Sequence, residues 1–319
     1  MRLDKIGKIF DPKDHDLPDG CVSHAQSPQT LITEDGVRIY FSSRSVDAEN
    51  GKFRSRICFV DMDFALQKVL GVNSRTVVPL GGLGCFDEHG IFPMNVMRNG
   101  DDVWGYTCGW SRRVSVSVET AIGLAISRDG GRTFVRQGDG PIVGPTLNEP
   151  FLVGDGFVLR DATTFHMWYI FGQRWSVERP GAAPDRVYKI GHATSPDGVH
   201  FVKQDGVQIV PDVLGRDECQ ALPSVVFFGD AWHMAFCYRD IHGFRTDPAR
   251  GYRIGYARSS DLMSWHRDDA ALGLVGTSGS WDQDMQCYPH LCVVNGEMLL
   301  LYNGNAFGKD GFGLAKVHL

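Results

Sequence analysis

The 319-residue chain carries 32 lysine and arginine residues against 38 aspartate and glutamate residues, a net charge of −6, and 43% of it is hydrophobic. This composition is typical of a folded protein with a large buried core, and it disfavours a basic nucleic-acid-binding protein. No apolar run reaches the roughly 18 residues that a membrane span needs, and charged residues interrupt the N-terminus, where an export signal would be apolar. We therefore expect a cytoplasmic protein with no nucleic-acid or membrane partner.

The eight cysteines are scattered through apolar stretches and form no Cys-x-x-Cys pair. Zinc sites typically use such closely spaced cysteines, and disulfide frameworks belong to small secreted domains. We therefore expect reduced, mostly buried thiols, no metal site and no cofactor.

A short phrase recurs along the chain after a strand-like stretch at residues 5–10. Its clear copies are Ile-Gly-Leu-Ala at 122–125, Ile-Gly-His-Ala at 190–193, Ile-Gly-Tyr-Ala at 254–257 and Phe-Gly-Leu-Ala at 312–315, with a fainter copy, Ile-Cys-Phe-Val, at 57–60. The glycines of the clear copies are 68, 64 and 58 residues apart. This self-similarity predicts five units of roughly 60 residues, which leave little room for another domain.

Three of these phrases are followed by turns of similar sequence. They are Ser-Arg-Asp-Gly-Gly-Arg-Thr-Phe at 127–134, Ser-Pro-Asp-Gly-Val-His-Phe at 195–201 and Ser-Asp-Leu-Met-Ser-Trp at 260–265. Asp and Gly suit a tight turn, and the closing aromatic residue can pack back onto the sheet. We interpret the turns as hairpins between the two outer strands of a unit, and we expect their aspartates to have a structural role.

Another strand pair precedes each phrase, most clearly 223–228 with 232–238 and 289–294 with 298–302. Each unit is then a four-stranded antiparallel meander. Repeated meanders predict an all-β protein, a five-bladed β-propeller in a single domain spanning residues 1–319. The last unit ends after three strands, so the stretch at 5–10 should complete the last blade and close the ring, which removes exposed sheet edges.

The residues that enter the first strand of each unit should gather at one rim with the residues that leave the second strand. We align the units on Pro28, Pro93, Pro150, Pro223 and Pro289. Glu88, Glu218 and Asp284 stand five residues before their prolines, and Glu149 stands immediately before its own. These four are the candidate catalytic residues, because convergent carboxylates can raise a pKa into the range of a general acid.

Further candidates for substrate binding share this rim. They are His24, Gln26, Arg44, His89, Trp110, Arg112, Arg174, Trp175, Gln220, Arg239, Asp240, Gln286 and Asn305. Arginines suit hydroxyl, carboxylate or phosphate groups, and aromatic rings can stack on sugar faces. Alternatively, the same charges form rim salt bridges, such as Glu88 with Arg112 or Glu218 with Arg239, and the histidines are structural.

The Ile-Gly-x-Ala strand, the Ser-Asp-Leu-x-x-Trp hairpin and the acid-Pro segments resemble the five-bladed propeller glycoside hydrolases of families 43, 32, 68 and 130. In families 43 and 32 the resemblance implies a first-blade Asp as base or nucleophile, a second Asp that tunes the pKa, and a Glu as general acid. It assigns the tuning role to Glu149 and the general acid to Glu218. Ser27-Pro28 takes the place of the first-blade Asp, so Glu88 or Asp284 would have to replace it.

The resemblance leaves several activities open at a central acidic pocket. The leading hypothesis is a glycoside hydrolase-like enzyme acting on a glycosidic bond, with an oligosaccharide or activated sugar as its partner. A phosphorylase or a sugar transferase would use phosphate or a nucleotide sugar and would not need the missing base. A sugar-binding propeller would catalyse nothing. The sialidase-like Asp-box at 127–134 occurs in full in a single unit, which disfavours a sialidase.

Overall fold

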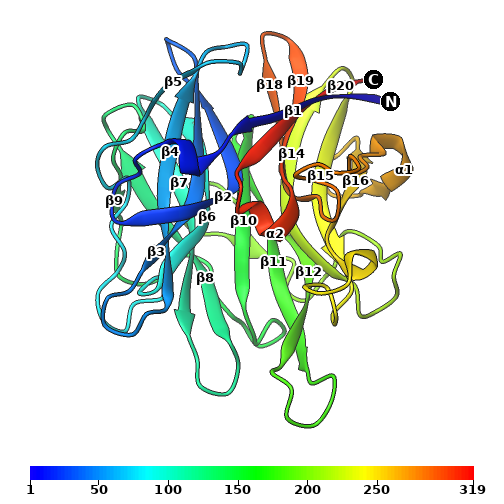
Figure 1. Ribbon diagram of the computed structural model, residues 1–319. Helices are drawn as coiled ribbons and strands as arrows, with labels where there is room; N and C mark the ends of the chain where they lie inside the picture. The colour runs from blue at the N-terminus through cyan, green and yellow to red at the C-terminus, as the bar shows by residue number, and fades with distance from the viewer.

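A computed structural model describes residues 1–319 as an almost entirely β-structured chain (Figure 1). The strands are β1 (Arg2–Phe10), β2 (Cys21–Ile32), β3 (Val37–Val46), β4 (Phe53–Met62), β5 (Val69–Val72), β6 (Gly90–Asn99), β7 (Asp102–Arg112), β8 (Val118–Ser127), β9 (Val135–Arg136), β10 (Val153–Asp161), β11 (Thr164–Ser176), β12 (Asp185–Ser195), β13 (Val202–Lys203), β14 (Cys219–Phe228), β15 (Ala231–Arg239), β16 (Arg253–Ser259), β17 (His266–Arg267), β18 (Cys287–Val294), β19 (Glu297–Asn303) and β20 (Phe312–His318). The helical segments are single turns: η1 (Pro12–Asp14), η2 (Pro248–Arg250), α1 (Asp269–Leu272) and α2 (Asn305–Gly308). The all-β prediction is confirmed.

Hydrogen bonding groups the strands into antiparallel meanders. Three sheets have four strands, in the orders β10-β11-β12-β13, β14-β15-β16-β17 and β1-β20-β19-β18, and one sheet has eight. The larger sheet joins the meander β2-β3-β4-β5 to the meander β6-β7-β8-β9 through one parallel pair, Ser55 with Gly90. The first strands β2, β6, β10, β14 and β18 contact one another in sequence, and β18 contacts β2, so the arrangement closes on itself.

The chain closes this arrangement with its N-terminal strand. β1 pairs antiparallel with β20, from Arg2 opposite His318 to Phe10 opposite Phe312, and both termini lie at the same end of the sheet (Figure 1). The prediction that residues 5–10 complete the last meander is confirmed, although the strand begins three residues earlier. The pairing covers the edge that β20 would otherwise expose.

The recurring phrase forms the third strand of its meander, and its glycine meets a packing requirement. A Cβ atom added at Gly123 would lie 2.4 Å from the Phe86 ring, and one added at Gly313 would lie 2.3 Å from the Trp281 ring. Either side chain would displace an aromatic ring that rests on the strand. The repeat therefore reflects close packing between rings and backbone.

The acids of the outer hairpins are structural, as predicted. Ser127 Oγ donates to Asp129 Oδ1 (2.7 Å), which also accepts the backbone amides of Arg132 and Thr133. Burial opposes ionisation of Asp129, but the hydrogen bonds from Thr133 outweigh it and lower the pKa of this carboxyl to about 2. Asp197 and Asp261 repeat the Ser-Asp contact in later hairpins.

Four meanders share an ion pair that joins the segment before the first strand to the fourth strand. These strand-joining ion pairs are Asp87 with Arg136 (2.8 Å), Glu149 with Lys203 (2.5 Å), Glu218 with Arg267 (2.6 Å) and Asp282 with Lys5 (2.5 Å). Each cation stands opposite the alanine of the recurring phrase. The acids are at most 1% exposed. Because each pair sits at an equivalent place and is buried, its role is to hold the meander together.

Candidate active site

Each first strand contains a β-bulge, where two of its residues oppose one residue of the second strand. The bulged pairs are Ser27-Pro28, Phe92-Pro93, Asp155-Gly156, Leu222-Pro223 and Tyr288-Pro289. Ser27, Asp155, Leu222 and Tyr288 have left-handed backbones, with φ of 52 to 55°. Bulges re-aim side chains, and the side chains of Phe92, Asp155 and Tyr288 line one pocket.

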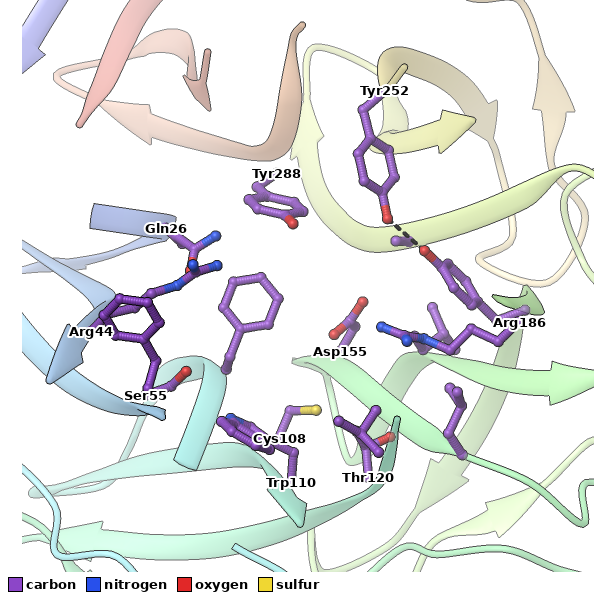
Figure 2. Close-up of a pocket in the computed structure, with 17 residues that line it drawn as sticks. Gln26, Arg44, Ser55, Cys108, Trp110, Thr120, Asp155, Arg186, Tyr252 and Tyr288 are labelled. Carbon is purple, nitrogen blue, oxygen red and sulfur yellow. Dashed lines mark hydrogen bonds between the residues drawn. The ribbon is translucent and has the colours of Figure 1, made fainter. Parts of the chain in front are cut away.

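This central pocket has a volume of about 300 Å³ and receives residues from every sheet (Figure 2). Its polar lining consists of Gln26, Arg44, Ser55, Thr120, Asp155, Arg186, Tyr188, Tyr252 and Tyr288. Phe53, Phe92, Trp110, Leu152 and Ile170 are among its apolar lining residues. A concave apolar site with a few polar groups is the usual form of a small-molecule site.

Asp155 is the only carboxylate in the pocket lining. It belongs to β10, is 7% exposed and forms no ion pair. Burial raises the pKa of Asp155 to about 7, although the backbone of Leu222 and the positive charge of Arg186 oppose this rise. A carboxyl group with this pKa is protonated in a large share of molecules at neutral pH, so it can donate or accept a proton there.

Two arginines in the lining carry charges that no carboxylate of the protein pairs. The guanidinium of Arg44, on β3, contacts the Phe53 ring (5.7 Å to the centroid) and forms no hydrogen bond within the protein. Arg186 on β12 donates one hydrogen bond, to Ser117 Oγ (3.1 Å). Figure 2 shows Arg44 beside Gln26 on one side of the pocket and Arg186 beside Asp155 on the other. Burial lowers the pKa of Arg44, but a guanidinium group remains charged at neutral pH.

A third, fully buried arginine holds a pair of tyrosines at the pocket wall. Arg239 Nη2 donates to Tyr188 Oη (3.0 Å), and Tyr188 Oη lies 2.5 Å from Tyr252 Oη (Figure 2). The Arg239 guanidinium also donates to backbone carbonyls and lies 3.5 Å from the Phe244 ring centroid, with no carboxylate partner. Burial raises the pKa of both tyrosines, so their hydroxyls keep their protons.

Three of the predicted substrate-binding residues, Gln26, Arg44 and Trp110, line the pocket. Three other predicted residues, His24, His89 and Arg112, lie close to Arg44 or Trp110. Burial and the neighbouring charge of Arg44 lower the pKa of His24 to about 4, so this histidine is neutral at pH 7. His89 stacks on the Trp110 ring at 5.9 Å, and the Arg112 guanidinium lies 5.6 Å from the same ring.

The other predicted substrate-binding residues contact protein groups and do not line the pocket. Arg174 pairs with Asp217, Trp175 lies beneath the Arg186 guanidinium, Gln220 donates to Glu218, Asp240 lies 3.9 Å from Arg253, Gln286 donates to the Asp282 carbonyl, and Asn305 accepts the Asp284 amide. Arg239 acts from behind the pocket wall, through Tyr188. The rim therefore divides into a pocket and a surrounding structural network.

None of the four predicted carboxylates lines the pocket. Glu149 and Glu218 belong to the strand-joining ion pairs. Burial opposes ionisation of Glu218, but hydrogen bonds from Gln220, Arg267 and backbone amides outweigh it and lower the pKa of this carboxyl. A general acid needs the opposite environment. The salt-bridge alternative paired Glu218 with Arg239, but the partner of Glu218 in the structure is Arg267.

Glu88 and Asp284 are not equivalent to Glu149 and Glu218 in the structure. Glu88 is half-buried and accepts the Gly84 amide (3.1 Å), and no ion pair joins it to Arg112, while Asp284 is exposed. The equivalent residues in their meanders are Asp87 and Asp282, which form strand-joining ion pairs. The repeated acids therefore mark a repeated structural contact, and the carboxylate that lines the central pocket is Asp155.

Asp155 was missed because the third unit was aligned on the wrong residue. Pro150 precedes β10, and the bulge position that proline takes in the other units is occupied here by Gly156. The recoverable signal is a spacing: in four units the residue before the bulged proline or glycine lies 14 positions before an aromatic residue of the second strand. The four spacings run from 27 to 41, 155 to 169, 222 to 236 and 288 to 302.

Solved structures share this architecture across the whole chain. A glycoside hydrolase superposes with a TM-score of 0.73 at 16% identity, covering 99% of this chain and 91% of that chain. A thermostable family-43 glycoside hydrolase gives 0.65 at 13% identity (95% and 92% covered). The β-1,2-mannobiose phosphorylase from Listeria innocua, in complex with β-1,2-mannobiose, gives 0.67 at 12% identity (99% and 97% covered). The chain therefore has the glycoside hydrolase-like propeller fold that its motifs resemble.

Two mycobacterial proteins are similar to the chain in sequence. No protein-family model matches the chain. The chain belongs to the family of two Mycobacterium tuberculosis proteins, uncharacterized protein MT1551 of strain CDC 1551 and uncharacterized protein Rv1502 of strain H37Rv. Each is 35% identical over 319 residues, which cover 99% of both chains. No helix has the length and apolar character needed to cross a bilayer.

Proposed function

We propose that residues 1–319 form one five-bladed propeller domain, a cytoplasmic carbohydrate-active enzyme that acts on a glycosidic bond in the pocket around Asp155. Counting the eight-stranded sheet as two blades gives five meanders, whose first strands contact one another in a closed ring. The observation that carries the proposal is the Asp155 carboxyl, which is unpaired, buried at the centre of this ring and has a pKa of about 7.

The chemistry assigned to Asp155 is proton transfer to the leaving group. When the bond between the anomeric carbon and the glycosidic oxygen breaks, the protonated carboxyl donates its proton to that oxygen, and the carboxylate that remains is stabilised by Arg186. The Trp110 and Phe92 rings offer apolar faces for a sugar. The general-acid role moves from Glu218 to Asp155, and Glu218 keeps a structural role.

Phosphorolysis is the second candidate, and one observation favours it over hydrolysis. A hydrolase needs two carboxylates, one as the acid and a second to activate water or to attack. The pocket lining contains a single carboxylate, Asp155. Phosphate attacks the anomeric carbon itself, so this reaction needs only the acid and a site for the anion. A transferase that uses a nucleotide sugar has the same requirement.

The test is turnover of a panel of aryl glycosides and oligosaccharides, with and without phosphate. We expect Asp155→Asn to abolish turnover while the matched variant Asp230→Asn, whose side chain is 93% exposed, retains it. Turnover that requires phosphate supports phosphorolysis, and turnover without phosphate supports hydrolysis. Full activity of Asp155→Asn would refute the assignment, and sugar binding without turnover by any donor would indicate a binding protein.

A further inference from the structure

The charges around the pocket do not balance within the protein. Arg44 and Arg186 face it with no carboxylate partner, and Asp155 is the single acid in the lining. Asp155 lies beside Arg186 and across the pocket from Arg44 (Figure 2). The Arg44 side of the pocket therefore holds a positive charge that nothing in the chain neutralises. A partly buried guanidinium without a partner is costly, because water solvates it incompletely there.

The hydroxyl groups of the wall add hydrogen-bond donors to the positive charge of Arg44. Arg239 occupies a lone pair of Tyr188, and the Tyr188–Tyr252 contact uses one of the two hydroxyl protons, whichever residue donates it. One hydroxyl proton of this pair is therefore left without a protein acceptor. Tyr288 Oη lines the same pocket and forms no hydrogen bond within the protein.

We propose that the pocket binds an oxyanion group of its ligand, a carboxylate or a phosphoryl group, with Arg44 as its principal anchor. A neutral sugar hydroxyl can be bound by the uncharged groups on the Arg44 side, such as the Gln26 amide and the Ser55 hydroxyl, but it leaves the positive charge of Arg44 without a counter-charge. A carboxylate or phosphoryl group brings only acceptors, and its planar or tetrahedral oxygens fit the guanidinium fork. This inference rests on the proposed function for the location of the site, and it adds the charge class of the ligand.

The neighbours of Arg44 fit this assignment. His24, with its pKa lowered to about 4, adds no second positive charge at neutral pH and no negative one. Gln26 is held in place by donating to the Phe307 carbonyl (2.7 Å). Arg44 therefore has an uncharged imidazole and an uncharged amide beside it, on a strand whose position is set by the sheet.

The test measures binding and needs no turnover. The probes are inorganic phosphate, glucuronate and glucose, added to the full-length protein at constant ionic strength set with sodium chloride, and the readouts are calorimetric affinity and the melting temperature. The variants are Arg44→Gln and Arg113→Gln. The control residue Arg113 pairs with Glu119 (3.0 Å) and is 56% exposed, so its substitution changes net charge equally without touching the pocket.

We expect phosphate, glucuronate or both to bind the wild type, and Arg44→Gln to weaken that binding about tenfold or more, with Arg113→Gln unchanged. Binding of phosphate alone would indicate a phosphoryl group, and preference for glucuronate over glucose would indicate a carboxylate on the sugar. Equal affinities of wild type and Arg44→Gln, or no anion binding beyond chloride, would overturn the inference. Binding is measured directly, so a failure to find turnover that depends on Asp155 would leave the anion-binding result valid. Likewise, a failure to find anion binding at Arg44 would not refute the role of Asp155 in turnover.

Discussion

Replacing Asp155 by asparagine should stabilise the protein at alkaline pH. The folded protein binds a proton at Asp155 up to a pKa of about 7, whereas an ordinary aspartate has a pKa of 3.8. Between these two values the folded state holds the proton more tightly, so the stability contributed by this group falls as the pH rises. Since one pKa unit is worth about 1.4 kcal/mol, ionised Asp155 costs the folded state about 4 kcal/mol above pH 7. Asparagine has a similar shape and no such cost.

The assay is chemical unfolding of wild type and Asp155→Asn at several pH values from 4 to 8. At pH 4 most of the cost is absent, because the folded protein holds Asp155 neutral, and the two proteins should have similar unfolding free energies. Towards pH 8 the variant should become more stable by an amount approaching the worked value. All other groups are common to both chains and cancel in the difference. Parallel curves, as we expect for Asp230→Asn against wild type, would refute the buried, unpaired environment assigned to Asp155.

Three further predictions concern the reaction, the strand-joining ion pairs and closure. If Asp155 is the general acid, kcat/KM should fall about tenfold per pH unit above pH 7, because the acid must carry its proton; a rate unchanged up to pH 9 would contradict this. Glu218→Gln should lower the unfolding free energy by about 2 kcal/mol, because it removes one of the two carboxylates that pair with Arg267, and Asp269 remains as the other, whereas Glu88→Gln should change little in the same denaturation assay. Removing residues 1–10 exposes the edge of β20, so we expect early thermal unfolding and self-association by size-exclusion chromatography; a stable monomer would argue against closure by β1.

The fold was accessible from sequence because its repeat reflects packing that every meander needs. The glycine of Ile-Gly-x-Ala makes room for an aromatic ring, as at Gly123 and Phe86, and the alanine stands opposite a cation of the fourth strand. Such requirements recur with the architecture and leave a periodic signal. The closing strand was equally accessible, since the last unit visibly lacks one.

The site was less accessible, because its residues depart from the repeat. Asp155 occupies a bulge position that holds serine, phenylalanine, leucine or tyrosine in the other meanders. Glu149 and Glu218 were predicted as catalytic candidates because acids recur before the first strands. In the structure this recurrence reflects the strand-joining ion pairs. Arg44 could be identified because it lies 16 residues after Pro28, as Arg239 and Asn305 lie 16 residues after Pro223 and Pro289. Arg186 belongs to no such repeated spacing.

A crystal structure with a bound carbohydrate tests the central claim most directly. We predict that the glycosidic oxygen, or its equivalent in a product, lies within hydrogen-bonding distance of the Asp155 carboxyl, and that an oxyanion of the ligand or of phosphate contacts Arg44. A ligand held outside the central pocket, for instance against Glu88 or Asp284, with Asp155 still enclosed and untouched, would contradict this account.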